Sequence, residues 1–185
     1  MTLAAAVMAL AALPGTRLRR VSRLYRTLPV GPLKQPDYHN AAVALDAPAG
    51  PDPETGALAL LGALKALERA FGRRAGPRWG PRELDLDLLV FGPHEVRIGR
   101  RAGPPAGESP RARASWLVVP HPEAVGRLFV LAPLADIAPG LRPPGWGTSV
   151  ARARDRAASI AGPAAVRPVG TWNAAGERWD PLDPG

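Results

Sequence analysis

The chain has 185 residues and a mass of 19.4 kDa, which suits a single domain. It contains no cysteine, and this excludes disulfides, thiolate zinc sites, iron–sulfur clusters and cysteine nucleophiles. The formal net charge of +8 comes almost entirely from arginine, because Lys34 and Lys65 are the only lysines. Arginine binds phosphate through a bidentate fork, so the composition favours a phosphorylated ligand or nucleic acid over an acidic protein partner.

An apolar run over residues 3–13 opens the chain and ends at Pro14 and Gly15. Its arginines follow it rather than precede it, so it does not match a secretion signal. At about eleven residues it is also shorter than the roughly 20 that a membrane-spanning helix needs. We therefore predict a buried helix in a soluble, cytoplasmic protein.

Two strands and a long helix are predicted next. The strands cover residues 17–26 and 38–45, and a loop rich in proline and glycine separates them. Leucines at helical spacing predict a helix over residues 57–71, and Gly72 is its stop signal. Residues 82–91 are predicted to form a further strand after a basic loop.

Residues 99–115 have no hydrophobic period and almost no apolar side chain, which predicts a disordered insertion. Beyond it we expect a short strand over residues 117–119, an apolar element over residues 128–137 and a helix near residues 149–160. This element order is typical of an α+β domain. We place that domain at residues 1–160 and a weakly structured tail at residues 161–185.

Within the strand predicted over residues 82–91, the stretch from residue 82 to residue 89 alternates between leucine and charged side chains. Its leucines should face a core, while the opposite face carries Glu83, Asp85 and Asp87. Such an acidic row is tolerable as a solvated face. Two carboxylates at i and i+2 nevertheless lie about 7 Å apart along a strand, a span well suited to bridging two hard cations.

The residues before this acidic row favour a metal and phosphate site over a solvated face. Four arginines precede the carboxylates: Arg73, Arg74, Arg78 and Arg82. Cations and metal ions are needed together where a polyphosphate is held in line for transfer. The chain has no Gly-Lys-Ser or Gly-Lys-Thr, so side chains and metal rather than a glycine-rich loop would hold the phosphates.

Residues 78–89, RWGPRELDLDLL, resemble the signature of the 6-hydroxymethyl-7,8-dihydropterin pyrophosphokinase family. That family moves pyrophosphate from ATP to a pterin alcohol in folate biosynthesis. Further stretches over residues 22–45, 67–74 and 119–139 resemble the same family in the same order. The resemblance implies a ferredoxin-like α+β fold, an antiparallel sheet with helices on one face.

The resemblance also implies roles for residues at the phosphate end of the site. Asp85 and Asp87 would hold two magnesium ions between the ATP phosphates and the pterin hydroxymethyl group. Arg73 and Arg82 would act on the phosphates as catalytic and ATP-binding residues. The other nucleotide contacts implied are Leu88, His121 and Arg127.

At the pterin end, the resemblance implies an aromatic sandwich made by Tyr38 and Phe129. Aromatic faces suit a flat heterocycle, and an amide side chain can both donate to and accept from the pterin edge. The residues implied to read that edge are Asn40, Thr27 and the backbone near Val30. Trp79 would sit on a loop that closes over the site.

Family chains open with an apolar strand and a Gly-Ser-Asn turn, whereas Met1 here falls almost at the first helix. We therefore expect the first strand of the fold to be missing. Residues 165–169 are the only obvious substitute, but Pro168 cannot donate to a ladder, which argues against a central position.

Two alternatives to the active enzyme stay open. One is a catalytically impaired, truncated homologue. The other is a basic nucleic-acid-binding module that uses the arginines and five tryptophans, although it leaves the aligned carboxylates unexplained. The main hypothesis is a monomer that binds ATP and the pterin, with neither nucleic acid nor a membrane as a partner.

Overall fold

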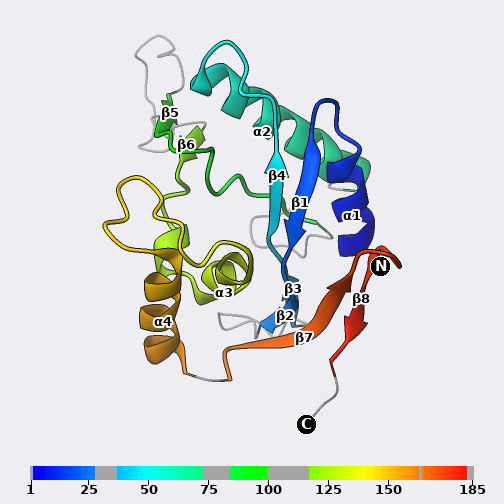
Figure 1. Ribbon diagram of the computed structural model, residues 1–185, viewed down its shortest axis with the longest axis vertical. Coiled ribbons are helices and arrows are strands. Elements are labelled where there is room, and N and C mark those ends of the chain that lie inside the picture. The colour runs from blue at the N-terminus through cyan, green and yellow to red at the C-terminus, as the bar shows by residue number, and fades with distance from the viewer. Residues whose placement is uncertain (1, 28–36, 73–83, 100–116, 163, 183–185) are drawn as a thin grey trace, which may run out of the picture.

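The computed structural model describes residues 2–27, 37–72, 84–99, 117–162 and 164–182. Helices and antiparallel strand pairs are both present, which confirms the α+β, ferredoxin-like class (Figure 1). The helices are α1 (Thr2–Ala11), α2 (Pro53–Ala70), α3 (Leu128–Ile137), α4 (Val150–Ala161) and the 3-10 turn η2 (Ala124–Gly126). The strands are β1 (Arg17–Val21), β2 (Leu24–Thr27), β3 (Tyr38–Asn40), β4 (Val43–Asp46), β5 (Val96–Ile98), β6 (Leu117–Val119), β7 (Val166–Asn173) and β8 (Arg178–Pro181).

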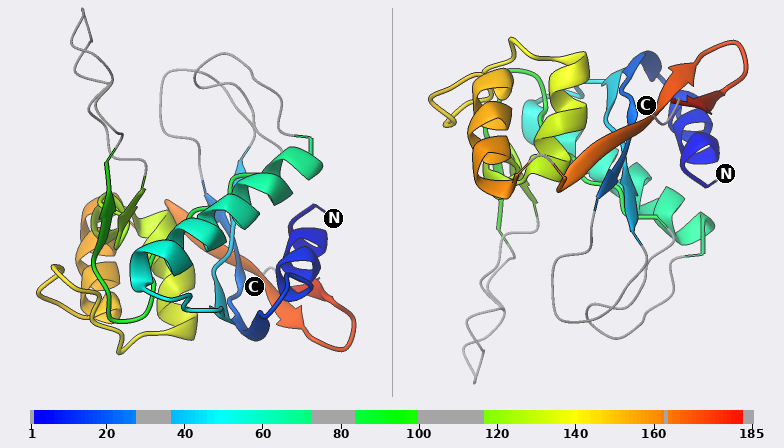
Figure 2. Two further views of the ribbon diagram at one scale, coloured as in Figure 1. Left: turned by 90° about the horizontal axis from the view of Figure 1, so that it is seen from above. Right: turned by 90° about the horizontal axis from the view of Figure 1, so that it is seen from below.

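The strands of the described residues form three antiparallel groups. β1 pairs with β4, β5 pairs with β6, and the largest sheet has the order β3-β2-β7-β8. α2 crosses behind β1 and β4 in Figure 1, and Figure 2 shows α1 beside the β7–β8 hairpin. The predicted insertion over residues 99–115 lies almost wholly outside the described residues, between the paired ends of β5 and β6.

The helix α1 confirms the buried helix predicted from the opening apolar run, because Ala6, Val7 and Leu10 are buried. α2 begins four residues before its predicted start. Asp52 caps it by accepting a 2.8 Å hydrogen bond from the Thr55 N–H. No helix within the described ranges is long and apolar enough to span a membrane.

A two-stranded hairpin, β7 and β8, occupies residues that we expected to form a weakly structured tail. β7 pairs with β2 and so lies inside the sheet, against our inference from Pro168. Pro168 stands opposite Tyr25, beside a shift in register, and β8 pairs with β7 only from Gly170 onward. The proline is tolerated because the ladder with β2 is irregular beside it and, among the described residues, none pairs with it on the other side.

Two tryptophans fasten this hairpin to the rest of the chain. The rings of Trp172 and Trp179 meet edge to face, with centroids 4.7 Å apart. The Trp179 indole N–H donates a 2.8 Å hydrogen bond to the Ser22 carbonyl, just before β2. β7 and β8 therefore cover what would otherwise be an open edge of β2.

The segment after the basic loop is not the strand that we predicted. Between residues 84 and 90 it has no ladder partner among the described residues, and only Phe91 forms an isolated bridge, with His94. The predicted alternation is nevertheless confirmed over the part described. Leu84 is buried, whereas Asp85 and Asp87 are exposed.

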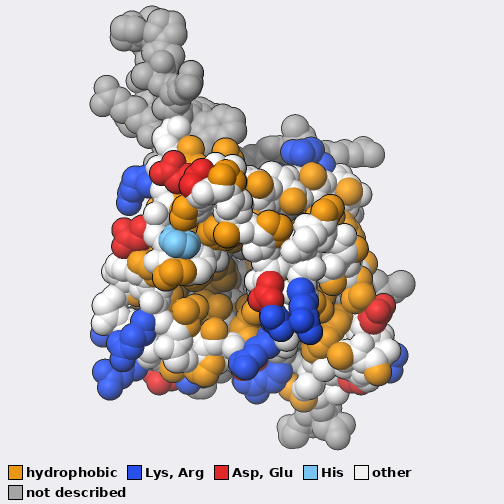
Figure 3. All heavy atoms as spheres, turned by 45° about the horizontal axis from the view of Figure 1, so that its top comes forward, with side chains coloured by type: hydrophobic (Ala, Val, Ile, Leu, Met, Phe, Trp, Pro, Cys, Tyr) orange, Lys and Arg blue, Asp and Glu red, His pale blue; other side chains and the backbone are white. Residues whose placement is uncertain are grey.

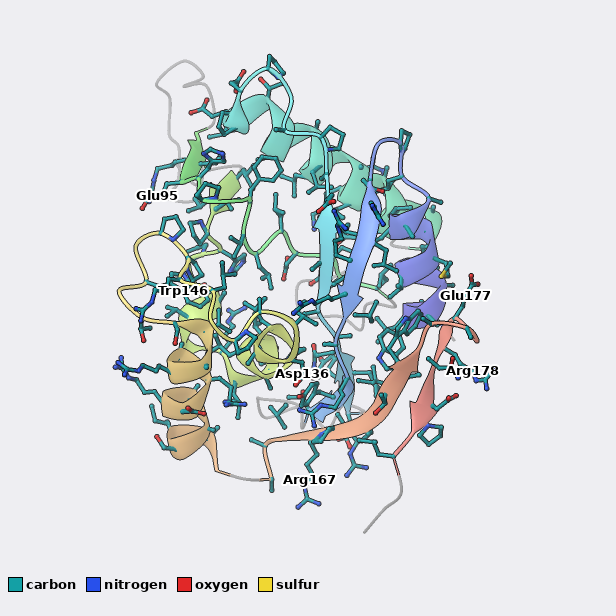
Figure 4. The ribbon with its side chains drawn as sticks, in the orientation of Figure 1. Glu95, Asp136, Trp146, Arg167, Glu177 and Arg178 are labelled. Atoms are coloured by element: carbon teal, nitrogen blue, oxygen red, sulfur yellow. The ribbon has the colours of Figure 1, made fainter. Side chains whose placement is uncertain are left out.

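This extended segment passes between two hydrophobic cores. Leu88 packs against the cluster that α2, β5 and β6 form around Phe91, and Leu89 packs against the cluster of α3 and the start of α4. Trp146, labelled in Figure 4, joins the second cluster to the contact between α3 and α4. The two cores fix the segment from both sides even though no strand of the described residues runs beside it.

Candidate active site

The β2–β3 pair brings together three of the residues implied to bind the pterin. Thr27 stands opposite Tyr38 and Tyr25 stands opposite Asn40, so the side chains of these two pairs share one face of the sheet. The Asn40 amide donates a 2.8 Å hydrogen bond to the Thr27 hydroxyl. Thr27 is buried, while Tyr38 is 46% exposed.

Helix α3 covers the same face of the sheet and carries Phe129 in its first turn. The helix is anchored by Asp136, which lies between α3 and β2 in Figure 4. The buried Tyr25 hydroxyl donates to the Asp136 carboxylate at 2.9 Å, and the Arg23 guanidinium donates to it at 2.6 and 3.0 Å. This anchor sets where α3, and with it Phe129, stands against β2 and β3.

The anchor shifts the pKa of both partners. Burial, reinforced by the bond to Asp136, raises the pKa of Tyr25 to about 12. Burial also acts to raise the pKa of Asp136, but the bonds from Arg23 and Tyr25 outweigh it and the pKa is lowered. Asp136 is therefore ionised, and Tyr25 protonated, throughout the neutral range.

His121 and Arg127 lie in the stretch of chain that joins β6 to α3. The His121 backbone N–H donates a 2.9 Å hydrogen bond to the Leu89 carbonyl, which ties the histidine to the end of the segment that holds Asp87. The Arg127 guanidinium pairs with Glu123 and lies 5.8 Å from the Phe129 ring centroid. The Leu88 side chain faces the core, which leaves its backbone for any contact with the nucleotide.

Asp85 and Asp87 offer carboxylate oxygens to a magnesium ion. Both are exposed on the same side of an extended segment, and carboxylate oxygens are the ligands that Mg²⁺ prefers. The described residues contain no cluster of three or more acidic, histidine or cysteine side chains that could hold a metal alone. Two carboxylates fit an ion that keeps water and takes phosphate oxygens as its remaining ligands.

Two residues of α2, to which our sequence analysis did not assign this role, hold the peptide units between these aspartates. The Glu68 carboxylate accepts a 2.7 Å hydrogen bond from the Leu86 N–H, and Lys65 Nζ donates to the Leu86 carbonyl at 3.0 Å. Lys65 also donates to Glu68 at 2.8 Å. The signal was present in the sequence, since Glu68 continues the spacing of the buried helix positions 57 and 64.

Burial acts to raise the pKa of Glu68, because only 1% of the residue is exposed. The hydrogen bonds from the Leu86 N–H and from Lys65 outweigh burial and lower the pKa, and the neighbouring Asp85 side chain adds to the lowering. Glu68 is thus a buried carboxylate that stays ionised. The remaining residues implied for the site lie outside the described residues: Val30, Arg73, Trp79 and Arg82.

Several arginines are committed to ion pairs rather than to a ligand. Arg19 pairs with Asp46, and Arg178, labelled in Figure 4, pairs with Asp180. On the face shown in Figure 3 the basic side chains stand in separate groups with acidic side chains between them. The net positive charge is therefore no measure of how many arginines bind phosphate.

The fold is of the α+β class, and the paired aspartates Asp85 and Asp87 offer carboxylate oxygens to a metal ion. Residues 1–139 match the family described as 7,8-dihydro-6-hydroxymethylpterin-pyrophosphokinase (HPPK). The chain therefore belongs to the HPPK family. Residues 140–185, with α4 and the β7–β8 hairpin, lie beyond the matched region.

Curated relatives agree with this membership. The chain is 44% identical over 140 residues to the 2-amino-4-hydroxy-6-hydroxymethyldihydropteridine pyrophosphokinase of Pseudomonas aeruginosa, which covers 76% of this chain and 73% of the relative. It is 40% identical over 139 residues to the enzyme of the same name in Methylorubrum extorquens, covering 75% and 74%. For the one in Synechocystis, identity is 38% over 145 residues, covering 78% and 63%.

Proposed function

We propose that this chain performs the reaction of its family with Asp85 and Asp87 as the magnesium ligands. The reaction transfers pyrophosphate from ATP to 6-hydroxymethyl-7,8-dihydropterin in folate biosynthesis, so the chain is an ATP-dependent diphosphotransferase. The observation that supports the assignment of the ligands is the pair of exposed aspartates on a segment whose leucines are fixed in two cores.

In this reaction the pterin hydroxyl oxygen attacks the β-phosphorus of ATP. The bond from that phosphorus to the oxygen it shares with the α-phosphate breaks, AMP leaves, and the hydroxyl proton passes to solvent. Magnesium, when bound, neutralises phosphate charge and orients the two reactants. We propose that Asp85 and Asp87 together would hold two ions.

The protein contributes mainly position, which is the largest resource available to phosphoryl transfer. At the pterin end we propose that Tyr38 and Phe129 hold the two faces of the ring. The Asn40–Thr27 pair would read its polar edge, together with the backbone near Val30. Support comes from the shared face of β2 and β3 and from α3, which packs across that face.

At the nucleotide end we propose His121, Arg127 and the Leu88 backbone as ATP contacts. Support comes from the His121–Leu89 hydrogen bond, which places this group at the end of the acidic segment. Arg73, Arg82 and the loop residue Trp79 complete the site as expected from the sequence. The monomeric state and the cytoplasmic location also stand as proposals, and light scattering tests the first.

The direct test is the product mixture that the chain makes from Mg²⁺, ATP and the pterin alcohol. Chromatography and phosphorus NMR should show AMP and the pterin diphosphate in equal amounts, and a chelator should abolish both. Substitution of a pterin without its hydroxymethyl group should also stop AMP release. Formation of ADP with a pterin monophosphate, or AMP release that ignores the pterin, would contradict the proposal.

A further inference from the structure

The acidic segment, residues 84–90, is extended without a neighbouring strand among the described residues. The directions in which its two carboxylates point depend on how its backbone is held. Buried or half-buried peptide groups also need hydrogen-bond partners, which a sheet would normally supply. Here two side chains of α2 supply them.

The bonds fall on the two peptide units that join the aspartates. The Leu86 N–H belongs to the unit that follows Asp85, and Glu68 accepts its hydrogen bond at 2.7 Å. The Leu86 carbonyl belongs to the unit that precedes Asp87, and Lys65 donates to it at 3.0 Å. A donor and an acceptor from one helix thus hold both units in the way that an adjacent strand would.

The clamp, by which we mean Glu68 and Lys65, is itself rigid. The two side chains bond each other at 2.8 Å, and Glu68 is buried to 99% of its surface. A buried carboxylate is costly unless its oxygens are satisfied, so the helix and the segment stabilise each other only in this arrangement. Within the described part of the chain, no buried side-chain nitrogen or oxygen is left without a partner.

We propose that Glu68 and Lys65 are positioning residues that aim Asp85 and Asp87 at the phosphates of the substrate. The inference rests on the proposed function, because it takes the aspartates as the magnesium ligands. Neither residue touches the reacting atoms. Their effect passes through the Leu86 peptide groups and, for Glu68, also through its side-chain contact with Asp85. Outer-shell partners of this kind usually change metal affinity or activity by about 10- to 100-fold.

The test compares Glu68→Ala with Glu54→Ala, which removes the same group from an exposed position on the same helix. The Mg²⁺ concentration for half-maximal activity should rise about tenfold or more in Glu68→Ala and stay unchanged in the control. The Michaelis constant for the pterin should change less than about twofold, since the pterin face belongs to other elements. An unchanged Mg²⁺ requirement in Glu68→Ala overturns the proposal.

A second readout needs no activity. In the metal-free protein, the Leu86 amide should exchange with solvent about tenfold faster in Glu68→Ala than in wild type, while the Leu131 amide keeps its protection. Equal exchange at Leu86 in both proteins overturns the clamp.

Lys65→Met serves if Glu68→Ala fails to fold, because the Lys65 side chain is 34% exposed and its replacement keeps the stem. It should also raise the Mg²⁺ requirement, and an unchanged value overturns the proposal. Failure of the proposed function can be told apart from failure of the positioning role. If Asp85 is not a magnesium ligand, Asp85→Asn retains activity. If instead the aspartate variants are inactive and Glu68→Ala is normal, only the positioning role is wrong.

Discussion

Replacement of Asp136 by asparagine should weaken the docking of α3 on β2. The Asp136 carboxylate accepts hydrogen bonds from Tyr25 at 2.9 Å and from the Arg23 side chain at 2.6 and 3.0 Å, and its own side chain is only 16% exposed. Hydrogen bonds to charged groups contribute about 1.5 to 3 kcal/mol each. The Arg23 side chain is 45% exposed and can return to water, so we expect a total loss of about 2 to 3 kcal/mol.

Thermal and urea unfolding of wild type and Asp136→Asn measure this loss. For a chain of this size it corresponds to a fall in Tm of about 4 to 12 °C. The pKa of Asp136 in the folded protein is below its ordinary 3.8. The contribution of the ionised carboxylate to the free energy of unfolding is therefore complete above pH 3.8 and is lost as the pH falls through the folded pKa. The gap between the two proteins should therefore close in acid.

The matched control is Asp155→Asn, which removes an exposed carboxylate paired with Arg154. A surface pair of this kind contributes about 0 to 1 kcal/mol, so the control should unfold almost as wild type does. Equal stability losses for Asp136→Asn and Asp155→Asn would refute the anchoring role, as would a gap that does not depend on pH.

Three further predictions concern aromatic residues. Phe129→Ala should weaken pterin binding by about 1 to 3 kcal/mol in calorimetry with a non-hydrolysable ATP analogue, and an equal loss of nucleotide affinity would speak against stacking. Trp179→Phe keeps a ring against Trp172 but loses the hydrogen bond to the Ser22 carbonyl, so the free energy of unfolding should fall by about 1 kcal/mol. An unchanged Tm would show that the hairpin does not need that bond. Since the pKa of Tyr25 is raised to about 12, the contribution of its protonated hydroxyl to the free energy of unfolding is present below pH 10 and lost between pH 10 and 12. Thermal melts of Tyr25→Phe across this range should lack that alkaline loss.

The orientation of the aspartates could be predicted from the sequence because a period of two decides which side chains share a face. That rule needs only an extended backbone, so it held over residues 84–88 although they have no ladder partner among the residues that the structure describes. The partner of the segment could not be predicted in the same way. Its hydrogen bonds come from Glu68 and Lys65, and only the path of α2 in space brings these side chains to Leu86.

The C-terminal hairpin escaped prediction for a related reason. The rule that proline avoids central strands assumes a regular ladder on both sides. Pro168 has an irregular ladder on the β2 side and, within the part of the chain that the structure describes, no paired residue on the other. The contacts that hold the hairpin, between Trp172 and Trp179 and from Trp179 to Ser22, join residues far apart in the chain. Local pattern carries no information on such contacts.

The most direct test of the proposed site is AMP release by Asp85→Asn and Asp87→Asn with saturating ATP, pterin and Mg²⁺. Each change removes a metal ligand whose ion is expected to contribute about 4 kcal/mol in the transition state, so the rate should fall roughly a thousandfold. Both side chains are exposed, so thermal melts should match wild type. Asp155→Asn should keep full activity, whereas a tenth or more of the wild-type rate in either site variant would contradict their assignment as magnesium ligands.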